Sequence, residues 1–241
     1  MPDTGVVLVP TQTSQATALF HGLVPEALRS KAFGVLLDQI AENGGRLTTG
    51  MFGTGFLLQC LSDAGRDDVA YSLVATREYP GYGFMLDQGA TTLWEHWSRA
   101  EHWSRNHPMY SAVSAWFQRS LLGIRQADGS VGWQHIVVKP SVVGDLTWAR
   151  GHLDTVRGRI RSEWQTNGAG LLFDVEIPAN TRATVFVPMS GNQRRDVLEG
   201  GVLIVDDGVP RAASPAVQVR AVTDAVCEVS LGGGKYHFEV R

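Results

Sequence analysis

The sequence has 241 residues, of which 44% are hydrophobic and 19% are charged. That length suggests one large or two modest globular domains, and no run approaches the roughly 20 consecutive apolar residues of a membrane-spanning helix. With 21 Lys and Arg against 24 Asp and Glu, the net charge of -3 produces no field that would attract a polyanion, so nucleic acid is a poor candidate partner. The two cysteines, Cys60 and Cys227, lie too far apart in sequence to suggest a disulfide framework.

The first half of the chain has helical periodicity. A helix is predicted from Pro25, where the missing N–H costs nothing, to a stop at residues 43–45, which read Asn-Gly-Gly. The alanine-rich residues 11–22 are predicted to be its hairpin partner. Two further hairpins are expected, formed by the following pairs of segments: residues 52–63 with 67–78, and the shorter 91–97 with 108–125.

After Asp128-Gly129 the period changes to two, which is typical of strands with one buried and one exposed face. Ile160 and Trp164, for example, alternate with charged residues. Strands are predicted near residues 156–164, 171–177, 183–187, 217–221, 226–231 and 236–240. Closely spaced short strands favour a mostly antiparallel β-sandwich. The predicted fold class is therefore α+β and multidomain, with helical residues 1–128 followed by a sandwich in residues 129–241.

Residues 79–97 carry the side chains best suited to binding or catalysis. The segment combines glycines, aromatic residues, one Asp and one Glu in a connection between helices, where binding and catalytic groups concentrate. Aromatic faces beside carboxylates suit a sugar, since its C–H faces pack on rings while its hydroxyls need hydrogen-bonding partners. The alternative is that Trp94 and Trp97 are core residues at helical spacing and that Glu95 points to solvent.

A run at residues 89–97 reads Gly-Ala-Thr-Thr-Leu-Trp-Glu-His-Trp, and residues 105–110 read Arg-Asn-His-Pro-Met-Tyr. Together they resemble the second half of the catalytic domain of bacterial α-L-rhamnosidases, which are inverting glycosidases with a six-hairpin (α/α)6 toroid. Residues 11–13, 22–25, 45–49 and 52–54 are similar to the family's helical run, and the later strands resemble the β-sandwich that follows it. The resemblance implies hydrolysis of terminal α-L-rhamnosyl residues, with a rhamnosylated glycoside or polysaccharide as partner.

The resemblance also implies roles for individual residues. Glu95 stands where the family has its general base, which activates the water that displaces the sugar. Asn106 and His107 match a pair whose His contacts rhamnose hydroxyls. The alternative for His107 is a capping or packing role at a helix start.

Further candidates for the sugar pocket lie in the same segment. Trp94, Trp97 and Tyr82 are expected either to line the pocket or to pack in the core. Asp87 would either hydrogen-bond the sugar or hold its own loop in place. A second candidate base exists because residues 95–99, Glu-His-Trp-Ser-Arg, recur as residues 101–105. Glu95 is preferred over Glu101 because Gly-Ala-Thr-Thr precedes only Glu95.

The sequence departs from the family in one respect that affects chemistry. The family's general acid lies in the first half of the toroid, and this sequence resembles about three hairpins of the second half. We therefore expect a rhamnosidase-like chain that lacks its general acid, because a lone base cannot run the two-carboxylate mechanism. The alternative is a catalytically silent module that binds carbohydrate or another protein at most. An open half-toroid would also expose apolar helix faces, which favours self-association.

No metal or cofactor is expected. The histidines and glutamates of residues 95–107 lack the His-Glu-x-x-His spacing of a zinc site, and residues 232–234, Gly-Gly-Gly, form a turn with no helix after them to hold a phosphate. Cys60 and Cys227 lie in apolar segments, which is typical of buried structural thiols. The lack of a signal peptide after Met1 favours the cytoplasm, but a true start elsewhere would leave the compartment open.

Overall fold

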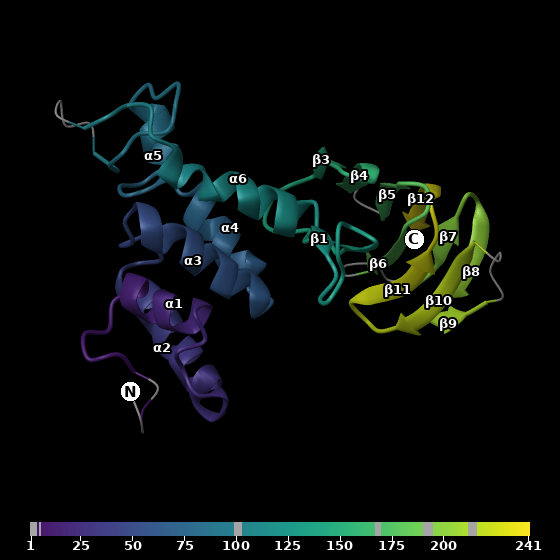
Figure 1. Ribbon diagram of the computed structural model, residues 1–241, viewed down its shortest axis with the longest axis horizontal. Coiled ribbons are helices and arrows are strands. Elements are labelled where there is room, and N and C mark those ends of the chain that lie inside the picture. The colour runs from purple at the N-terminus through teal and green to yellow at the C-terminus, as the bar shows by residue number, and fades with distance from the viewer. Residues whose placement is uncertain (1–3, 5, 99–102, 167–169, 190–194, 212–215) are drawn as a thin grey trace. The chain divides into compact units, whose positions relative to one another are not determined.

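The computed structural model describes residues 4, 6–98, 103–166, 170–189, 195–211 and 216–241. The chain divides into two compact units, Met1–Trp116 and Phe117–Arg241. The first unit is helical, and the second consists mainly of strands (Figure 1). The α+β fold class predicted from the sequence is thus confirmed.

The described part of the helical unit contains these helices and 3-10 turns: α1 (Gln12–Phe20), η1 (Glu26–Leu28), α2 (Arg29–Glu42), α3 (Met51–Asp63), α4 (Asp67–Ala75), α5 (Tyr82–Asp87), η2 (Pro108–Ser111) and α6 (Ala112–Trp116). Helix α3 packs against α1, α4 and α6 and so forms the centre of this unit. A capping box begins α1, because Thr11 Oγ1 accepts the Ser14 N–H at 3.1 Å and Ser14 Oγ accepts the Thr11 N–H at 3.0 Å. Gly53 allows α1 close to α3, since a Cβ there would lie 2.6 Å from Thr13 Oγ1.

The predicted third hairpin is wrong in detail. Residues 91–97 are not helical, because their backbone groups bond across the chain: Glu95 N–H donates to Ser104 O at 2.8 Å, and His107 N–H donates to Leu93 O at 2.8 Å. The segment predicted as one helix over 108–125 is instead η2, α6, a π-helical turn at Phe117–Leu121 and the first strand. The sequence also gave no indication of α5, which lies inside the predicted loop.

The second unit contains two sheets. Its strands are β1 (Ile124–Gln126), β2 (His135–Val138), β3 (Trp148–Thr155), β4 (Gly158–Thr166), β5 (Leu171–Ile177), β6 (Arg182–Pro188), β7 (Val197–Glu199), β8 (Val202–Asp206), β9 (Val209–Pro210), β10 (Val217–Val222), β11 (Val226–Leu231) and β12 (Gly234–Val240). One sheet has the order β1-β2-β6-β11-β10 and the other the order β3-β4-β5-β12-β7-β8-β9. Among the described residues, all strand pairs are antiparallel except β2 with β6.

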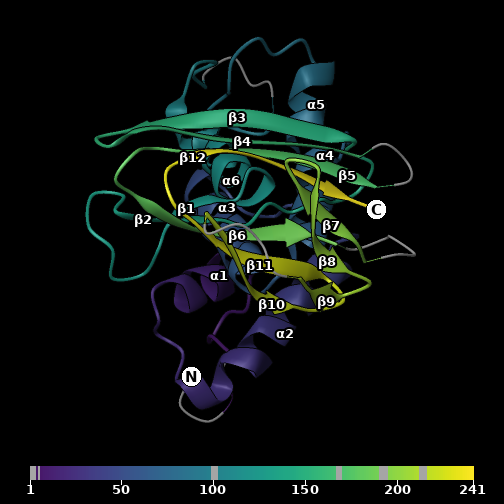
Figure 2. The same cartoon turned by 90° about the vertical axis from the view of Figure 1, so that its right-hand side faces the viewer.

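The two sheets enclose one apolar core, and Figure 2 shows β3, β4 and β5 of one sheet as a layer above β6 and β11 of the other. Trp164 on β4, Phe173 on β5 and Phe238 on β12 are fully buried from one sheet, as are Val185 and Val229 from the other. Their alternation along each strand is the period of two seen in the sequence. Strand β3 was missed because none of its residues is fully buried and its half-buried face includes Gly151 and Thr155, so its hydrophobic alternation is weak.

The two units meet in sequence at Trp116 and Phe117, whereas the sequence predicts the boundary after residue 128. Residues 117–121 continue the helical period, yet their carbonyls bond to the strand-containing unit. Trp164 Nε1–H donates to Leu121 O at 2.8 Å, and Arg125 Nε–H donates to Arg119 O at 2.8 Å. These contacts explain why a helical turn belongs to the second unit.

Candidate active site

The candidate active site is built on the loop between α5 and η2. Hydrogen bonds join the two ends of this loop: Glu95 N–H to Ser104 O, His107 N–H to Leu93 O, and the Thr92 hydroxyl to Arg105 O. Gly89 begins the loop with a φ of 82°, a conformation that favours glycine. The loop therefore holds residues 92–95 beside residues 104–107.

Glu95 is partly buried on this loop. Its Oε2 accepts the Ser104 backbone N–H at 2.9 Å. A backbone donor of this kind fixes the direction of the carboxylate. An oriented carboxylate is what a general base requires.

The aromatic residues of the motif lie in the interior. Trp94 and Trp97 are 4% and 5% exposed, and Tyr82 is 8% exposed. Trp97 Nε1–H donates to Thr49 O at 2.8 Å, and the Trp97 ring lies 4.0 Å from the Tyr110 ring centroid. Such burial suits packing more than stacking against a sugar, which was the alternative noted from the sequence.

The Tyr82 hydroxyl is part of the same cluster. It donates to the Tyr110 carbonyl at 2.9 Å, and the Tyr82 ring meets the Trp97 ring edge-on at 5.1 Å. Burial, with a smaller effect of Tyr110, raises the pKa of Tyr82 far above its usual range. The phenol therefore stays protonated and serves as a donor that ties α5 to η2.

His107 caps the 3-10 turn that follows the loop. Its Nδ1 accepts the Met109 N–H at 3.3 Å. Because Nδ1 is an acceptor, a neutral ring carries its proton on Nε2, which is then a donor. Capping and sugar contact are thus compatible, since they use different ring nitrogens. Asn106 is exposed, and its backbone N–H donates to Ser104 Oγ at 3.2 Å.

Asp87 forms an ion pair with Arg77 at the C-terminal end of α5. Arg77 Nε–H donates to Asp87 Oδ2 at 3.0 Å, and an Arg77 Nη2–H donates to Oδ1. The pair also raises the pKa of Arg77. Of the two roles considered from the sequence, the described contacts correspond to the one that holds the loop in place.

Described residues of the two copies of Glu-His-Trp-Ser-Arg contact each other. The His96 and Trp103 rings are stacked at 5.4 Å with an interplanar angle of 11°. Ser98 Oγ and His96 Nδ1 are 2.8 Å apart within the first copy, whereas Ser104 of the second copy contacts Glu95. Glu101, the alternative base, lies outside the described residues.

Sequence reasoning missed the residues that hold the candidates in place. Ser104, Thr49 and Arg77 contact Glu95, Trp97 and Asp87, respectively. Ser104 and Thr49 act through backbone atoms, which no sequence pattern identifies. The recurrence of residues 95–99 as 101–105 was the one sequence feature that could have suggested the contact of Ser104 with Glu95, because a duplicated segment can fold back on its first copy.

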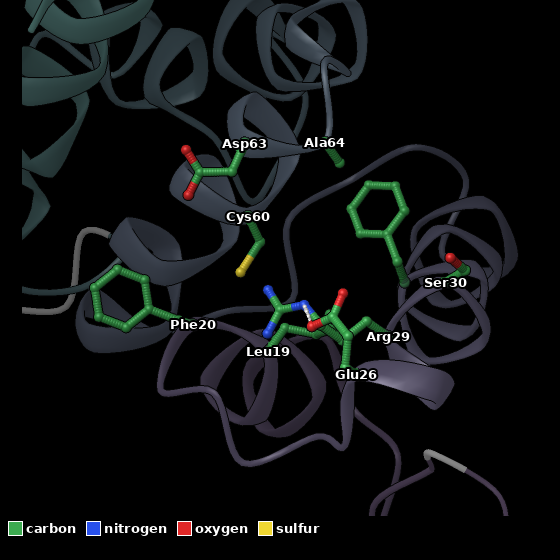
Figure 3. A pocket seen from close by; sticks show the side chains of 9 residues that line it. Leu19, Phe20, Glu26, Arg29, Ser30, Cys60, Asp63 and Ala64 are labelled. Atoms are coloured by element: carbon green, nitrogen blue, oxygen red, sulfur yellow. Dashed lines mark ion pairs between the residues drawn. The ribbon is translucent and has the colours of Figure 1, made fainter. Parts of the chain in front are cut away.

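A separate pocket of about 330 Å³ lies between α1, η1, α2 and α3 (Figure 3). Its guanidinium, Arg29, has Nε 3.7 Å from Glu26 Oε2. The Cys60 thiol donates to Ala16 O at 3.5 Å, and burial raises the pKa of this thiol to about 12. Its polar groups thus bond mainly within the protein.

The described residues contain no group of three or more His, Cys, Asp or Glu side chains arranged to hold a metal ion. In the same part of the chain, no helix has both the length and the apolar character needed to cross a membrane.

Two family models match the chain. Residues 1–121 match the bacterial alpha-L-rhamnosidase 6 hairpin glycosidase domain, and residues 123–201 match the bacterial alpha-L-rhamnosidase C-terminal domain. The two matches meet near the point at which the structure divides into helices and strands.

Curated relatives agree with these matches. An alpha-L-rhamnosidase of Streptomyces avermitilis is 33% identical over 85% of this chain and 20% of its own length. An alpha-L-rhamnosidase of Formosa agariphila is 31% identical over 98% of this chain and 24% of its own length. The chain thus spans about a fifth to a quarter of these relatives.

Solved structures show the same likeness. An α-L-rhamnosidase from Dictyoglumus thermophilum has a TM-score of 0.84 and 31% identity, covering 97% of this chain and 26% of that one. The Streptomyces avermitilis enzyme complexed with L-rhamnose has a TM-score of 0.81 and 30% identity, covering 96% of this chain and 22% of that one. The chain therefore belongs to the family of bacterial α-L-rhamnosidases with a six-hairpin glycosidase domain.

Proposed function

We propose that this chain forms the base-bearing part of an inverting α-L-rhamnosidase, a glycoside hydrolase that removes terminal α-L-rhamnosyl residues. The observation that carries the proposal is the Glu95 carboxylate, which lies in the family's Trp-Glu motif and accepts the Ser104 N–H at 2.9 Å. Glu95 removes a proton from a water molecule as that water attacks the anomeric carbon. The water attacks from the face opposite the leaving group, so the configuration inverts.

The other site residues support this reaction from around the base. His107 orients rhamnose hydroxyls through its Nε2–H while its Nδ1 caps η2. Asn106 contributes an exposed amide beside it. The buried aromatic residues that support the loop are Trp94, Trp97 and Tyr82. Asp87, held by Arg77, fixes the end of α5.

Protonation of the leaving group needs a second carboxyl group. In an inverting enzyme the two carboxyl groups stand roughly 6.5–9.5 Å apart, which leaves room for the attacking water. We assign the acid to residues outside these 241, because the chain spans only about a fifth of the length of its relatives. A substrate whose leaving group needs no protonation therefore tests the base without the acid.

A substrate with a good leaving group tests the base alone. The phenol of 2,4-dinitrophenyl α-L-rhamnoside leaves as a stable anion without protonation, whereas the methanol of methyl α-L-rhamnoside needs a general acid. The purified chain is expected to release dinitrophenolate faster than buffer does and to leave the methyl rhamnoside intact. Glu95→Gln should slow that release about 100-fold or more, the usual contribution of acid–base catalysis.

Glu42→Gln is the matched control, because Glu42 ends α2 and bonds only to Gln39 among the described contacts. This control should keep the rate of the unchanged chain. Equal rates for Glu95→Gln and the unchanged chain would contradict the role of Glu95. Absence of release would instead favour a catalytically silent, carbohydrate-binding or interaction module.

We also propose that the helical unit self-associates. Leu23, Phe52 and Leu86 are 63%, 66% and 64% exposed. Large apolar side chains at that exposure favour association when they form a contiguous patch. We propose that a second copy of the chain covers these side chains. Residues 1–121 match the six-hairpin model, whereas their described α-helices, α1 to α6, supply about three hairpins.

A further inference from the structure

A second cavity lies in the strand-containing unit. It has a volume of about 540 Å³ and is formed by β2, β6, β10 and β11 together with the turn before β12. Ligand pockets usually have volumes of about 300–1,000 Å³, so this one has room for a sugar residue. The side chains that decide its chemistry are those of His135, Arg182, Thr184, Gln218, Arg220 and Ser230.

Strand register places these side chains on one face of the sheet. His135 pairs with Arg182, Thr184 pairs with Ser230, and Ser230 pairs with Gln218. Residues in register across neighbouring strands point to the same face. Their sequence neighbours Ile136, Ala183 and Val229 are buried in the core. These polar side chains of the pocket therefore lie on the outer face of the sheet, and the core residues Ala183, Leu231 and Tyr236 complete its lining.

A β-bulge positions Arg220. The register of β10 with β11 shifts between Val219 and Ala221, so Arg220 is the extra residue. Bulges re-aim side chains and are frequent beside binding sites. Arg220 Nε–H donates to Ser230 Oγ at 2.8 Å, which fixes the guanidinium over the pocket. The two terminal nitrogens of Arg220 make no hydrogen bond with another described residue.

The charged side chains that line the pocket are positive. Its lining contains two guanidiniums and no carboxylate, and neither Arg182 nor Arg220 forms an ion pair with a described residue. Other arginines of this unit do pair, as Arg195 does with Asp224 at 2.7 Å. Glu228 lies two residues before Ser230 on the same face of β11 but does not line the pocket. Two unpaired guanidiniums in a cavity favour an anionic ligand.

The remaining groups suit hydroxyls. Thr184 Oγ1 lies 3.0 Å from His135 Nε2, and the Gln218 side chain is exposed at the pocket. Burial, and then the positive charge of Arg182, lower the pKa of His135. His135 therefore serves as a neutral hydrogen-bonding group at pH 7 and adds no third charge.

We propose that this pocket binds a carboxylated sugar, with the carboxylate between Arg182 and Arg220 and the sugar hydroxyls on Thr184 and Gln218. An inorganic anion would use the guanidiniums alone and leave most of the cavity empty. The choice of a sugar rests on the proposed function, which makes carbohydrate the ligand class of this protein. The site would hold an acidic residue of a glycan in the strand-containing unit.

A direct binding measurement tests the proposal. The full chain is titrated by calorimetry with D-galacturonate, D-galactose and inorganic phosphate. Galactose is the matched probe because it has the galacturonate skeleton without the carboxylate. Galacturonate is expected to bind at least about tenfold more tightly than either of the other two.

Two variants locate the binding. Arg182→Gln should weaken galacturonate binding about tenfold or more, and Arg182 is exposed, so its loss should leave the thermal melt unchanged. Arg220→Lys, which keeps the charge but loses the fork of donors, should weaken binding as well. Arg150→Gln is the control, because Arg150 is an exposed arginine of β3 that packs on Trp148. That control should bind like the unchanged chain.

The possible results separate this proposal from the role of Glu95. Glu95→Gln should bind galacturonate normally, so Arg182-dependent binding would support the pocket even if no rhamnoside is hydrolysed. Equal affinity for galactose would overturn the role of the arginines. Equal affinity for phosphate would reduce the pocket to a plain anion site and overturn the sugar assignment. Absence of galacturonate binding, or equal weakening by Arg150→Gln, would overturn the proposal as a whole.

Discussion

Glu95 and Ser104 are joined by two backbone-mediated hydrogen bonds: the Glu95 N–H donates to the Ser104 carbonyl at 2.8 Å, and the Ser104 N–H donates to Glu95 Oε2 at 2.9 Å. The second bond uses the backbone of Ser104 and not its hydroxyl. The carboxylate is therefore oriented by the fold of the loop, and the identity of the side chain at position 104 matters little for it.

Two substitutions at Ser104 distinguish the effect of its backbone N–H on Glu95 from the effect of its side chain. Ser104→Ala keeps the N–H and should retain the hydrolysis rate of dinitrophenyl rhamnoside within about twofold, since one exposed hydroxyl contributes little. Ser104→Pro removes the N–H and should lower that rate about tenfold, the cost of a hydrogen bond to a charged group. Equal rates for the two variants would show that the bond does not orient Glu95.

Two glycines of the second unit have the same backbone conformation but different surroundings. Gly123 and Gly129 have φ values of 72° and 70°. A Cβ on Gly123 would lie 2.0 Å from the Lys139 carbonyl carbon, whereas one on Gly129 would meet nothing within 4 Å. Gly129→Ala should cost about 1–2 kcal/mol in free energy of unfolding, the penalty of a left-handed residue.

Gly123→Ala should cost more than Gly129→Ala, because the Lys139 backbone must also move. Urea unfolding of both variants, followed by circular dichroism, measures the difference. Equal free energies of unfolding would show that β1 and the segment after β2 can separate without penalty.

Cys227 should make the sandwich less stable as the pH rises into the alkaline range. Burial, with a smaller effect of Glu228, raises the pKa of this thiol to about 12. An unfolded chain loses the thiol proton near pH 8.5, so above that pH the unfolded state binds fewer protons than the native state. The free energy of unfolding should then fall by up to about 1.4 kcal/mol for each pH unit.

Cys227→Ala removes this contribution and should flatten the decline between pH 9 and 10. The slopes of free energy against pH are compared, because Ala also leaves a small cavity that lowers stability at every pH. Parallel slopes for the variant and the unchanged chain would contradict the raised pKa.

Exposed apolar side chains of the helical unit should cause concentration-dependent self-association. Light scattering behind size-exclusion chromatography is expected to show a mass above that of one chain, rising with concentration. Phe52→Ser should lower that mass, because Phe52 is 66% exposed. Val156→Ser, at an 89% exposed site of the second unit, is the control and should not. A monomer at every concentration would refute the prediction.

Much of the fold could be predicted because burial leaves a period in the sequence. Helices α2 and α3 and strands β5 and β11 each have a buried face that repeats at the period of their structure. Residues 91–97 could not be predicted, since Trp94 and Trp97 have helical spacing but are buried through a loop whose backbone bonds to residues 104–107. Strand β3 has only half-buried and exposed residues, and its half-buried face includes Gly151 and Thr155, so its hydrophobic period is weak.

The candidate site could be predicted only as far as its motif extends. Glu95 and His107 follow from the resemblance of residues 89–97 and 105–110, because chemistry requires particular side chains. Their supports did not follow, because Ser104 and Thr49 act through backbone atoms. The pocket beside Arg182 and Arg220 also left no sequence signal, since strand pairing brings together residues nearly 40 positions apart.

The most direct test of Glu95 as the base of an inverting enzyme is chemical rescue. Glu95→Ala is incubated with 2,4-dinitrophenyl α-L-rhamnoside and sodium azide, and the sugar product is examined by NMR. Azide needs no deprotonation, so it should replace the missing base and its water, restore release of dinitrophenolate and give β-L-rhamnosyl azide. Hydrolysis that continues without azide, or an azide product of α configuration, would contradict the account.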